Sequence, residues 1–476
     1  MASINPKLDN FLVKRLCRDE YESIKSCESA IIDANGTERY VLLTDRNLRL
    51  IDSPPKNIKL QISLSDIVSV SYEHNYVPFL NGLDRENTQH IKVEILDTNL
   101  NRLGSKKSSK SISDTHFLDL YIRSKTSSFC ANIKHAVARY IIKSTRMTSM
   151  ENDPENQIFL SKPEHIRFLF QELKTDLLES DGEVENMFML LRELLQSARK
   201  SYFVKKLFWK DFVLVEFFLE QLKKYCLTSS VNLSYNLAAD ARSDELELIT
   251  LIMELFAEFV CETESVNERN AFLQAEEFSY VRKLTVFCLS EPAMPEKFKK
   301  PIKTRNIADI FAGSCRSTTE SANSPADELL ISYCNFALAR QALLFELTIS
   351  AVEMKWMNPS NRFDIKWLAA QLVKHEEGLY EFSRVLIWLA MVILDLTVPD
   401  TLTPKQSLWI YEIFGFIQIL IDHSQKFAGF FRCEFQEEFK YFFLAEIVRK
   451  RLDEESRISA KIMGQMKTLR DAVVSQ

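Results

Sequence analysis

Glycine is scarce in this chain, which has 9 glycines among 476 residues, whereas an average protein contains roughly 7%. A backbone loop that cradles a phosphate needs glycine at closely spaced positions, so the composition argues against nucleotide-binding folds. The motif search agrees with this, because the sequence contains no Walker-type loop, no dinucleotide fingerprint and no Gly-x-Ser-x-Gly nucleophile motif.

Residue patterns for metal or redox chemistry are also missing. None of the 7 histidines lies three or four residues from another, and none of the 9 cysteines forms a Cys-x-x-Cys pair. Such spacing would place two ligands on one helix face or one turn. Most of the cysteines lie in apolar runs, where a free thiol behaves as a small hydrophobic group. We therefore expect no metal, no cofactor and no enzymatic activity.

Long hydrophobic runs are absent as well. The longest runs from Val385 to Leu394, between Arg384 and Asp395, and a segment of this length suits a buried helix better than a membrane span. The opening residues do not have the pattern of a secretory signal. The sequence predicts a cytoplasmic protein. Peripheral contact with a membrane surface is a further possibility.

Charge is divided unevenly along the chain. The net charge is −6, yet residues 1–145 carry 21 basic and 17 acidic residues, and the remainder carries 39 and 49. A mildly basic head on an acidic body suits an anionic surface at one end only. It does not suit a body that binds nucleic acid, so we expect no nucleic-acid partner.

A period-two pattern of apolar residues dominates residues 38–73. The pattern consists of four groups of apolar residues: Tyr40 and Leu42; Leu48 and Leu50; Leu60, Ile62 and Leu64; and Val68, Val70 and Tyr72. Breaks at residues 45–47 and 53–55 are rich in Asp, Asn and Pro, which favour turns. The pattern predicts short antiparallel strands, with one face toward a core and the other toward water.

The flanking segments complete a small domain. We expect an amphipathic helix over residues 6–22, a strand over 24–33 and a hairpin turn at Asn35-Gly36. Further strands are predicted over 90–96 and 117–122, and a helix capped by Ser127 or Ser128 follows. Six or seven strands closed by one helix predict a β-barrel capped by its C-terminal helix.

The stretch from residue 38 to 73 resembles a known family. Its motif is carried by Leu43-Thr44-Asp45, Leu48, Leu50, Leu64, Asp66 and Ile67. These residues are similar to those of the GRAM branch of the pleckstrin-homology (PH) superfamily, and the resemblance covers about the first 145 residues. It implies a PH-like barrel, and because the matching residues are core and turn positions, it says more about fold than function. An unrelated small barrel with the same strand order is the alternative.

The rest of the chain predicts an all-α region. We assign residues 1–145 to the PH/GRAM-like domain, 146–163 to a linker, 164–289 to a first helical lobe, 290–327 to a flexible connector and 328–476 to a second lobe. Helices are expected at about 164–179, 183–199, 209–226, 243–262, 267–289, 328–356, 364–376, 378–396, 404–424, 433–452 and 454–474. The tandem helices loosely resemble armadillo or HEAT-type repeats, with a plain bundle as the alternative.

Two groups of residues in the head are candidate contacts. PH-like domains hold inositol phosphates with Lys or Arg at the first hairpin, but the turn at 34–37 has no base. The candidate lipid contacts are therefore Lys106, Lys107, Lys110, Lys25 and Arg39. A solvated loop is the alternative for the three clustered lysines.

The second group is an apolar tip formed by Tyr76, Val77, Phe79 and Leu80. It is a candidate site for docking a partner, or else it packs on the protein itself. Together these features predict a non-enzymatic adaptor, whose head contacts a membrane or a protein and whose helical body binds protein partners. The alternative is a regulator of a small GTPase in membrane trafficking, which rests on architectural analogy alone.

Overall fold

The computed structural model describes residues 6–17, 20–21, 23–32, 37–73, 87–96, 115–124, 127–150, 163–180, 183–228, 238–261, 266–295, 325–357, 363–395, 400–454 and 456–474. The chain divides into two compact units, Met1–Ser144 and Thr145–Gln476.

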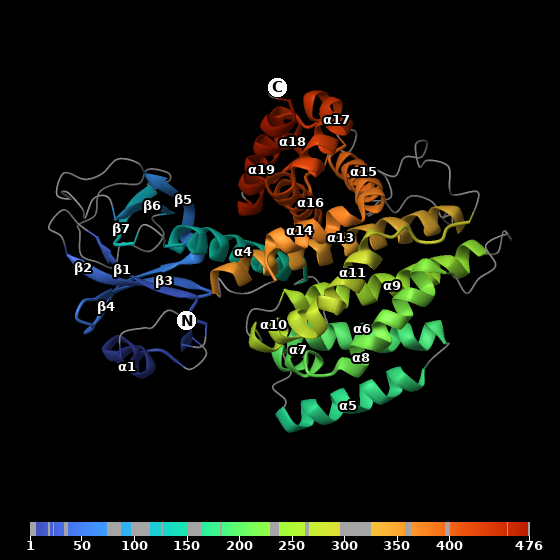
Figure 1. The fold of residues 1–476 in the computed structure, drawn as a ribbon, viewed down its shortest axis with the longest axis horizontal. Helices are drawn as coiled ribbons and strands as arrows, with labels where there is room; N and C mark the ends of the chain where they lie inside the picture. Colours follow the sequence, from blue (N-terminus) through green and yellow to red (C-terminus); the bar gives the residue numbers. More distant parts are fainter. Residues whose placement is uncertain are drawn as a thin grey trace. The chain divides into compact units, whose positions relative to one another are not determined.

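The first unit combines one short helix, seven strands and the start of a longer helix (Figure 1). Its elements are α1 (Pro6–Arg15), β1 (Ser26–Ile31), β2 (Glu38–Leu43), β3 (Asn47–Asp52), β4 (Ile58–Ser63), η1 (Leu64–Asp66), β5 (Ile67–Glu73), β6 (Gln89–Leu96), β7 (Thr115–Ile122) and α4 (Phe129–Met150). The Phe129 N–H donates to Ser127 Oγ at 3.2 Å. The helix therefore begins where the sequence predicted.

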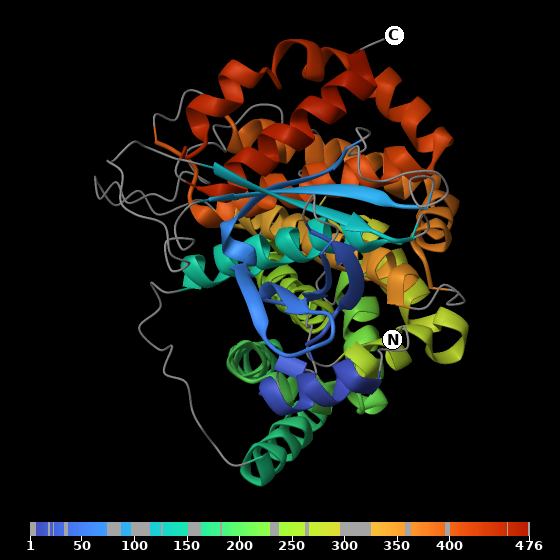
Figure 2. The same ribbon diagram turned by 90° about the vertical axis from the view of Figure 1, so that its left-hand side faces the viewer.

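The seven strands form one antiparallel sheet in the order β4-β3-β2-β1-β7-β6-β5. The β1–β7 contact is short, because only Ala30 and Ile31 pair with Ile122 and Tyr121. Two groups of strands therefore meet at a corner, and they cross each other in the turned view (Figure 2). The predicted closed barrel is not what the structure shows, since β4 and β5 are the two open edges of the sheet.

The junction between β4 and β5 explains this open form. Only the three-residue turn η1 separates the two edge strands, so the sheet must curl until its edges approach each other there. The turn begins at Ser63, whose hydroxyl accepts from Ser65 N–H, and the apolar residues Leu64 and Ile67 are buried beside it. A 3₁₀ turn redirects the chain instead of folding it into a hairpin, so no ladder forms between β4 and β5.

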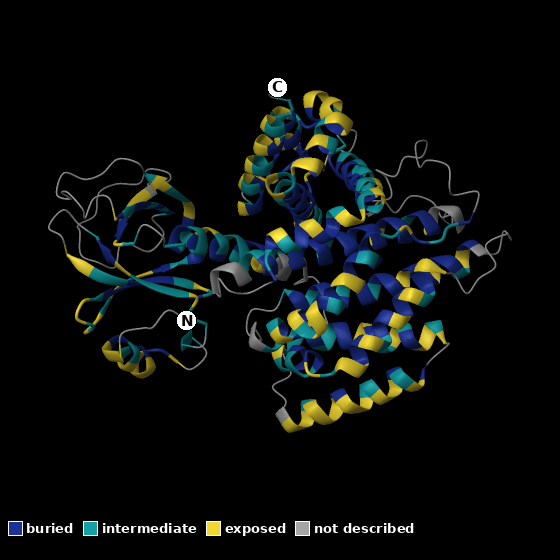
Figure 3. Ribbon diagram, in the orientation of Figure 1, coloured by how far each residue is buried: buried dark blue, intermediate teal, exposed yellow. Residues whose placement is uncertain are grey.

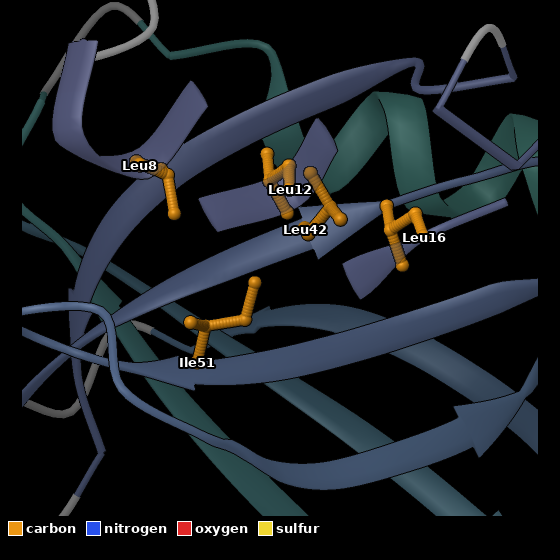
Figure 4. Packing of buried hydrophobic residues seen from close by; sticks show 5 residues of the cluster. All are labelled: Leu8, Leu12, Leu16, Leu42 and Ile51. Carbon is orange, nitrogen blue, oxygen red and sulfur yellow. The ribbon is translucent and has the colours of Figure 1, made fainter. Parts of the chain in front are cut away.

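Strands β2 and β3 are buried on both faces. Val41, Leu42 and Leu43 of β2 are all inaccessible, as are Leu48, Leu50 and Ile51 of β3 to within 1%. The second face is covered by α1, whose Leu8 and Leu12, with the following Leu16, pack on Leu42 and Ile51 (Figure 4). The expectation that one face of these strands meets water was wrong for β2 and β3, because α1 covers that face.

The described residues of the second unit form helices joined by short non-helical segments, and none of them forms a strand (Figure 1). Its elements are α5 (Pro163–Glu179), α6 (Val184–Lys200), α7 (Tyr202–Phe208), α8 (Phe212–Leu222), η3 (Lys223–Leu227), α9 (Ala238–Val260), α10 (Val266–Gln274), η4 (Ala275–Phe278), α11 (Ser279–Leu289), α13 (Pro325–Met357), α14 (Ile365–Lys374), α15 (Glu376–Ile393), α16 (Pro404–His423), α17 (Gln425–Tyr441), α18 (Ala445–Arg451) and α19 (Arg457–Val474). None of the helices described in either unit is long and apolar enough to cross a membrane.

Helix α13 is the centre of the second unit. Between Leu329 and Ala351 only Asn335 is exposed, and most of the helix is drawn in dark blue (Figure 3). The reason is that α9 packs along one side and α11, α14, α15 and α16 pack on the others. A helix that is apolar all round must lie between neighbours. The predicted lobes therefore touch through α9 and α13, where Ser243 Oγ lies 2.7 Å from Ser332 Oγ.

Arg340, in the middle of α13, is fully buried. Its Nη1 donates to the carbonyl oxygens of Ser290 at 2.8 Å and Cys288 at 3.4 Å, which are the free acceptors at the C-terminal end of α11. The rings of Phe336 and Phe382 each lie 4.7 Å from the guanidinium carbon. Its Nη2 also lies 3.7 Å from Glu291 Oε1. The buried charge is thus balanced by a carboxylate, by helix-end carbonyls and by aromatic faces.

Helices α15 and α17 run parallel, with α16 between them in the chain. Three contacts repeat every four residues along both helices: Glu376 pairs with Lys426, Tyr380 stacks on Phe430 with ring centroids 3.7 Å apart, and Arg384 Nε lies 2.7 Å from Glu434 Oε1. One helix turn of α15 therefore matches one helix turn of α17.

The helix predicted over residues 6–22 ends at Arg15, and two helical predictions for the second unit also differ from the structure. The predicted helix 267–289 is broken, because Glu276, Glu277 and Phe278 have φ values of 47°, 53° and 69°, and this left-handed region is costly for non-glycine residues. Burial of Phe278 against Phe363 and Trp367, at centroid distances of 6.0 and 4.6 Å, offsets that cost. The segment predicted as 433–452 is instead α17 and α18.

Glycine positions test the helix packing. A Cβ at Gly378 would lie 2.6 Å from the Leu289 carbonyl oxygen, whereas a Cβ at Gly464 would meet nothing within 4 Å. We expect Gly378→Ala to lower the free energy of unfolding by about 1–3 kcal/mol through overpacking. Gly464→Ala should raise it by about 0.5–1 kcal/mol through helix propensity. Urea unfolding measures both, and a gain in stability for Gly378→Ala would contradict the described contact.

Arg340→Met tests the buried guanidinium. The substitution leaves two carbonyl groups without their donor and Glu291 without its cation, so the free energy of unfolding should fall by about 1–3 kcal/mol. Arg432 is the matched control, because its Nε donates to the Ala472 carbonyl oxygen at 3.0 Å from a half-buried position. Water can replace that donor, so Arg432→Met should change stability by only about 0.5 kcal/mol. Equal effects of the two substitutions in urea unfolding would refute the role of Arg340.

Candidate functional site

Most of the residues predicted as contacts lie outside the described residues. These are the lysines Lys106, Lys107 and Lys110 and the whole apolar tip Tyr76, Val77, Phe79 and Leu80. Their roles stay predictions.

Lys25 and Arg39 are described, and the structure does not bring them together. The Lys25 N–H donates to the Leu43 carbonyl oxygen at 2.8 Å, whereas Arg39 pairs with Ala30 near the other end of the β1–β2 ladder. Strand alternation also places the two side chains on opposite faces. Lys25 and Arg39 therefore do not form one anion site.

The open edge of β5 is the feature of the first unit that most resembles a binding surface. Two apolar side chains of this strand are exposed, Val68 by 41% and Tyr72 by 45%. The Tyr72 hydroxyl bonds the thiol of Cys130 on α4, and burial together with this thiol raises the pKa of Tyr72. Lys134, one turn further along α4, places its Nζ 5.8 Å from the Tyr72 ring centroid. An apolar strand edge is thus bordered by one lysine of α4.

The sequence did not single out this edge. The alternation of apolar residues predicts that Val68 and Tyr72 face a core. The usable signal was the composition of β5, which has no Lys or Arg between Ile67 and Glu73. That signal gains meaning only when the strand is known to lie at the end of the sheet.

Buried polar groups of the second unit serve the packing. Arg242 of α9 donates from Nε to the Ala293 carbonyl oxygen at 2.8 Å and from Nη1 to the Tyr225 carbonyl oxygen at 2.7 Å. Its Nη1 also lies 2.6 Å from Glu245 Oε2. Arg242 and Arg340 thus hold the segment that leaves α11 from two sides.

The buried thiols are poorly suited to nucleophilic chemistry. Burial raises the pKa of Cys226 to about 11 and that of Cys27 and Cys334 to about 12, and it also raises the pKa of Cys288. A thiol reacts as its thiolate, so a raised pKa makes these cysteines inert near neutral pH. Among the described residues no group of three or more His, Cys, Asp or Glu side chains could hold a metal ion.

Acidic side chains gather where α6, α9 and α13 meet. Burial raises the pKa of Asp244, and the nearby charges of Asp240 and Glu185 raise it further. Burial and Asp244 likewise raise the pKa of Glu247, while a hydrogen bond from Ser332 lowers it. These carboxylates repel one another at neutral pH, so the cluster costs stability there.

Asp244→Asn tests this repulsion. Because the folded state holds a proton on Asp244 more tightly than the unfolded chain, stability falls as pH rises above the unfolded pKa. The substitution should raise the free energy of unfolding at pH 7 by about 0.5 kcal/mol, since the side chain is partly solvent-screened. The gain should vanish below the unfolded pKa. Glu172→Gln, at an exposed position of α5, serves as the control in urea unfolding at both pH values, and a gain independent of pH would argue against repulsion.

Comparison with known proteins places the chain in a family. The family model described as "Protein of unknown function (DUF4551)" matches residues 2–116 and 98–468. The human "Uncharacterized protein C12orf56" is 23% identical over 606 residues, covering 95% of this chain and 95% of that protein. No solved structure matches.

Two homologues of the human protein extend the comparison. The Macaca fascicularis homologue is 22% identical over 611 residues and also covers 95% of both chains. The mouse homologue is 26% identical over 345 residues, which is 70% of this chain and 62% of the relative. Because the family model covers most of the chain, the protein belongs to the DUF4551 family.

Proposed function

We propose that the protein is a non-enzymatic intracellular adaptor. In this proposal a PH-like first unit contacts an anionic membrane surface or a protein, and the helical second unit binds protein partners through its surface. An adaptor needs two surfaces of different chemistry on one chain, and no reacting group.

The proposal rests on one observation: the two compact units of the fold carry net charges of opposite sign. The first unit, Met1–Ser144, carries 21 basic and 17 acidic residues, and the second unit, Thr145–Gln476, carries 39 and 49. Opposite net charges on separate compact units favour two different partners, because each unit attracts the sign that the other repels.

The strand order supports a PH-like first unit. Four strands, β4 to β1, meet three strands, β7 to β5, at one corner, and α4 follows the last strand. This succession agrees with the resemblance of the sequence to the GRAM branch. A sheet of this kind offers loops and edges for recognition without requiring a catalytic group.

The buried polar groups of the second unit support a role in binding, not in catalysis. Arg340 donates to a backbone carbonyl oxygen at the end of α11, and Arg242 donates to one in the segment that follows α11. The buried thiols have raised pKa values. The groups that would be candidates for chemistry are thus used to join helices. The exposed surface of stacked helices remains for partner binding, as in armadillo-like proteins.

Vesicle flotation of the full chain tests the membrane part of the proposal. We expect association with phosphatidylserine- or phosphoinositide-containing vesicles at low salt, and none with phosphatidylcholine alone. The variant with Lys106, Lys107 and Lys110 each changed to Glu should bind more weakly by on the order of a hundredfold, since each lysine near the surface is worth about 1 kcal/mol.

The control for flotation changes Lys405, Lys450 and Lys467 of the second unit to Glu, which alters the net charge equally. Binding by the first variant equal to that of this control would show that the lysine stretch does not contact lipid. Nucleotide release from a panel of small GTPases is the second arm of the experiment. An adaptor leaves the release rates unchanged, whereas acceleration would contradict the non-enzymatic role.

A further inference from the structure

The sheet of the first unit ends in two edge strands, β4 and β5. On its inner side β5 pairs with β6 from Ile67 to Glu73, and among the described residues no strand pairs with its outer side. Alternate residues of an edge strand direct N–H and C=O groups outward, where they form a template for another strand.

The two edges differ in how they are protected. The edge strand β4 carries Lys59, which is 47% exposed and lies 3.6 Å from Asp52. A charged lysine on an edge discourages a second strand, because pairing would bury it. The edge strand β5 has no basic residue and instead exposes Val68 and Tyr72 by 41% and 45%. Of the two described edges, β5 is therefore the one that exposes large apolar side chains and carries no lysine.

Helix α4 supplies one wall beside this edge. The Tyr72 hydroxyl bonds the Cys130 thiol, and the exposed Lys134 extends over the Tyr72 ring with its Nζ 5.8 Å from the centroid. A strand added to β5 would run past this ammonium group. Charge complementarity then favours an occupant with a carboxylate near Tyr72.

We propose that the β5 edge binds an extended acidic peptide of a partner protein by strand addition, with a peptide carboxylate on Lys134. The proposal rests on the adaptor function and names the recognition surface of the first unit. Main-chain hydrogen bonds to β5 supply affinity, and alternate peptide side chains contact Val68 and Tyr72. A lipid surface has no ladder of backbone donors and acceptors, so it does not match this edge.

The test begins with a displayed library of random twelve-residue peptides, selected on the full chain without lipid. We expect enrichment of peptides with alternating apolar residues and at least one Asp or Glu. Tyr72→Lys should weaken the binding of a selected peptide about tenfold or more, because it places a charge on the edge. Lys134→Glu should weaken acidic peptides and leave neutral ones unchanged.

Val13→Lys is the matched control, since Val13 is an apolar residue of α1 that is 57% exposed on the same unit. It should leave peptide binding unchanged. Peptides methylated at backbone nitrogens keep the test independent of protein folding. Methylation at alternate positions that face β5 should abolish binding, and methylation at the intervening positions should not, because only strand addition uses every second peptide N–H.

Amide hydrogen exchange separates the possible occupants. Peptide binding should slow exchange at alternate amides between Val68 and Glu73.

The proposal is wrong if no peptide is enriched, if Tyr72→Lys binds as well as Val13→Lys, or if methylation has no alternating effect. It is also wrong if these amides are already protected in the free chain, which would indicate cover by the chain's own segments. Protection that depends on protein concentration would indicate a second copy and overturn it equally. None of these outcomes depends on vesicle binding or on GTPases, so the adaptor function can fail separately.

Discussion

The placement of one buried charge constrains the second unit. A guanidinium without exposure cannot remain uncompensated in a low-dielectric core, so the helices around Arg340 must supply acceptors. Helix α11 does so by ending at Leu289, which frees the carbonyl groups of Cys288 and Ser290. Helix α15 contributes the ring of Phe382 and approaches the same helix end at Gly378, where no side chain could fit beside the Leu289 carbonyl. Arg340 therefore fixes the point at which α11, α13 and α15 meet.

The first unit uses a similar device on a smaller scale. Arg49 of β3 is 3% exposed, and it lies among the apolar residues that α1 covers. Its Nη2 pairs with Glu20 Oε1 at 2.5 Å, and its Nε donates to Gln61 at 2.9 Å. The charge thereby links the segment after α1 to β3 and β4. This bond adds to the packing of Leu8, Leu12 and Leu16 on Leu42 and Ile51, and together these contacts hold a ten-residue helix that is too short to be stable alone.

The sequence was sufficient where the signal was local. Alternation placed the strands from β2 to β5, and the capping serine placed the start of α4. Local patterns failed where distant residues decide the outcome. The residues around Glu276 and Glu277 do not predict a left-handed turn, because none of them is glycine. The contacts that stabilise the turn are those of Phe278 with Phe363 and Trp367, which lie far away in the sequence. Arg340 could have been noticed as a lone charge within the apolar run FALARQALLF, but its acceptors lie about fifty residues earlier and no periodicity reveals them.

Recognition surfaces were harder to predict than the fold, for a physical reason. A lysine cluster or an apolar tip can be read from composition, whereas a strand edge is defined by what does not pair with it. That β5 is an edge strand follows only from the order of all seven strands in the sheet. In this order the first strand of the chain, β1, pairs with the last, β7, and β5 is left at one end. Once that order is known, the contrast between Lys59 on one edge and Val68 and Tyr72 on the other becomes informative. Selection against aggregation favours a lysine on an unused edge, so an edge with exposed apolar side chains and no lysine is the natural place to expect a partner.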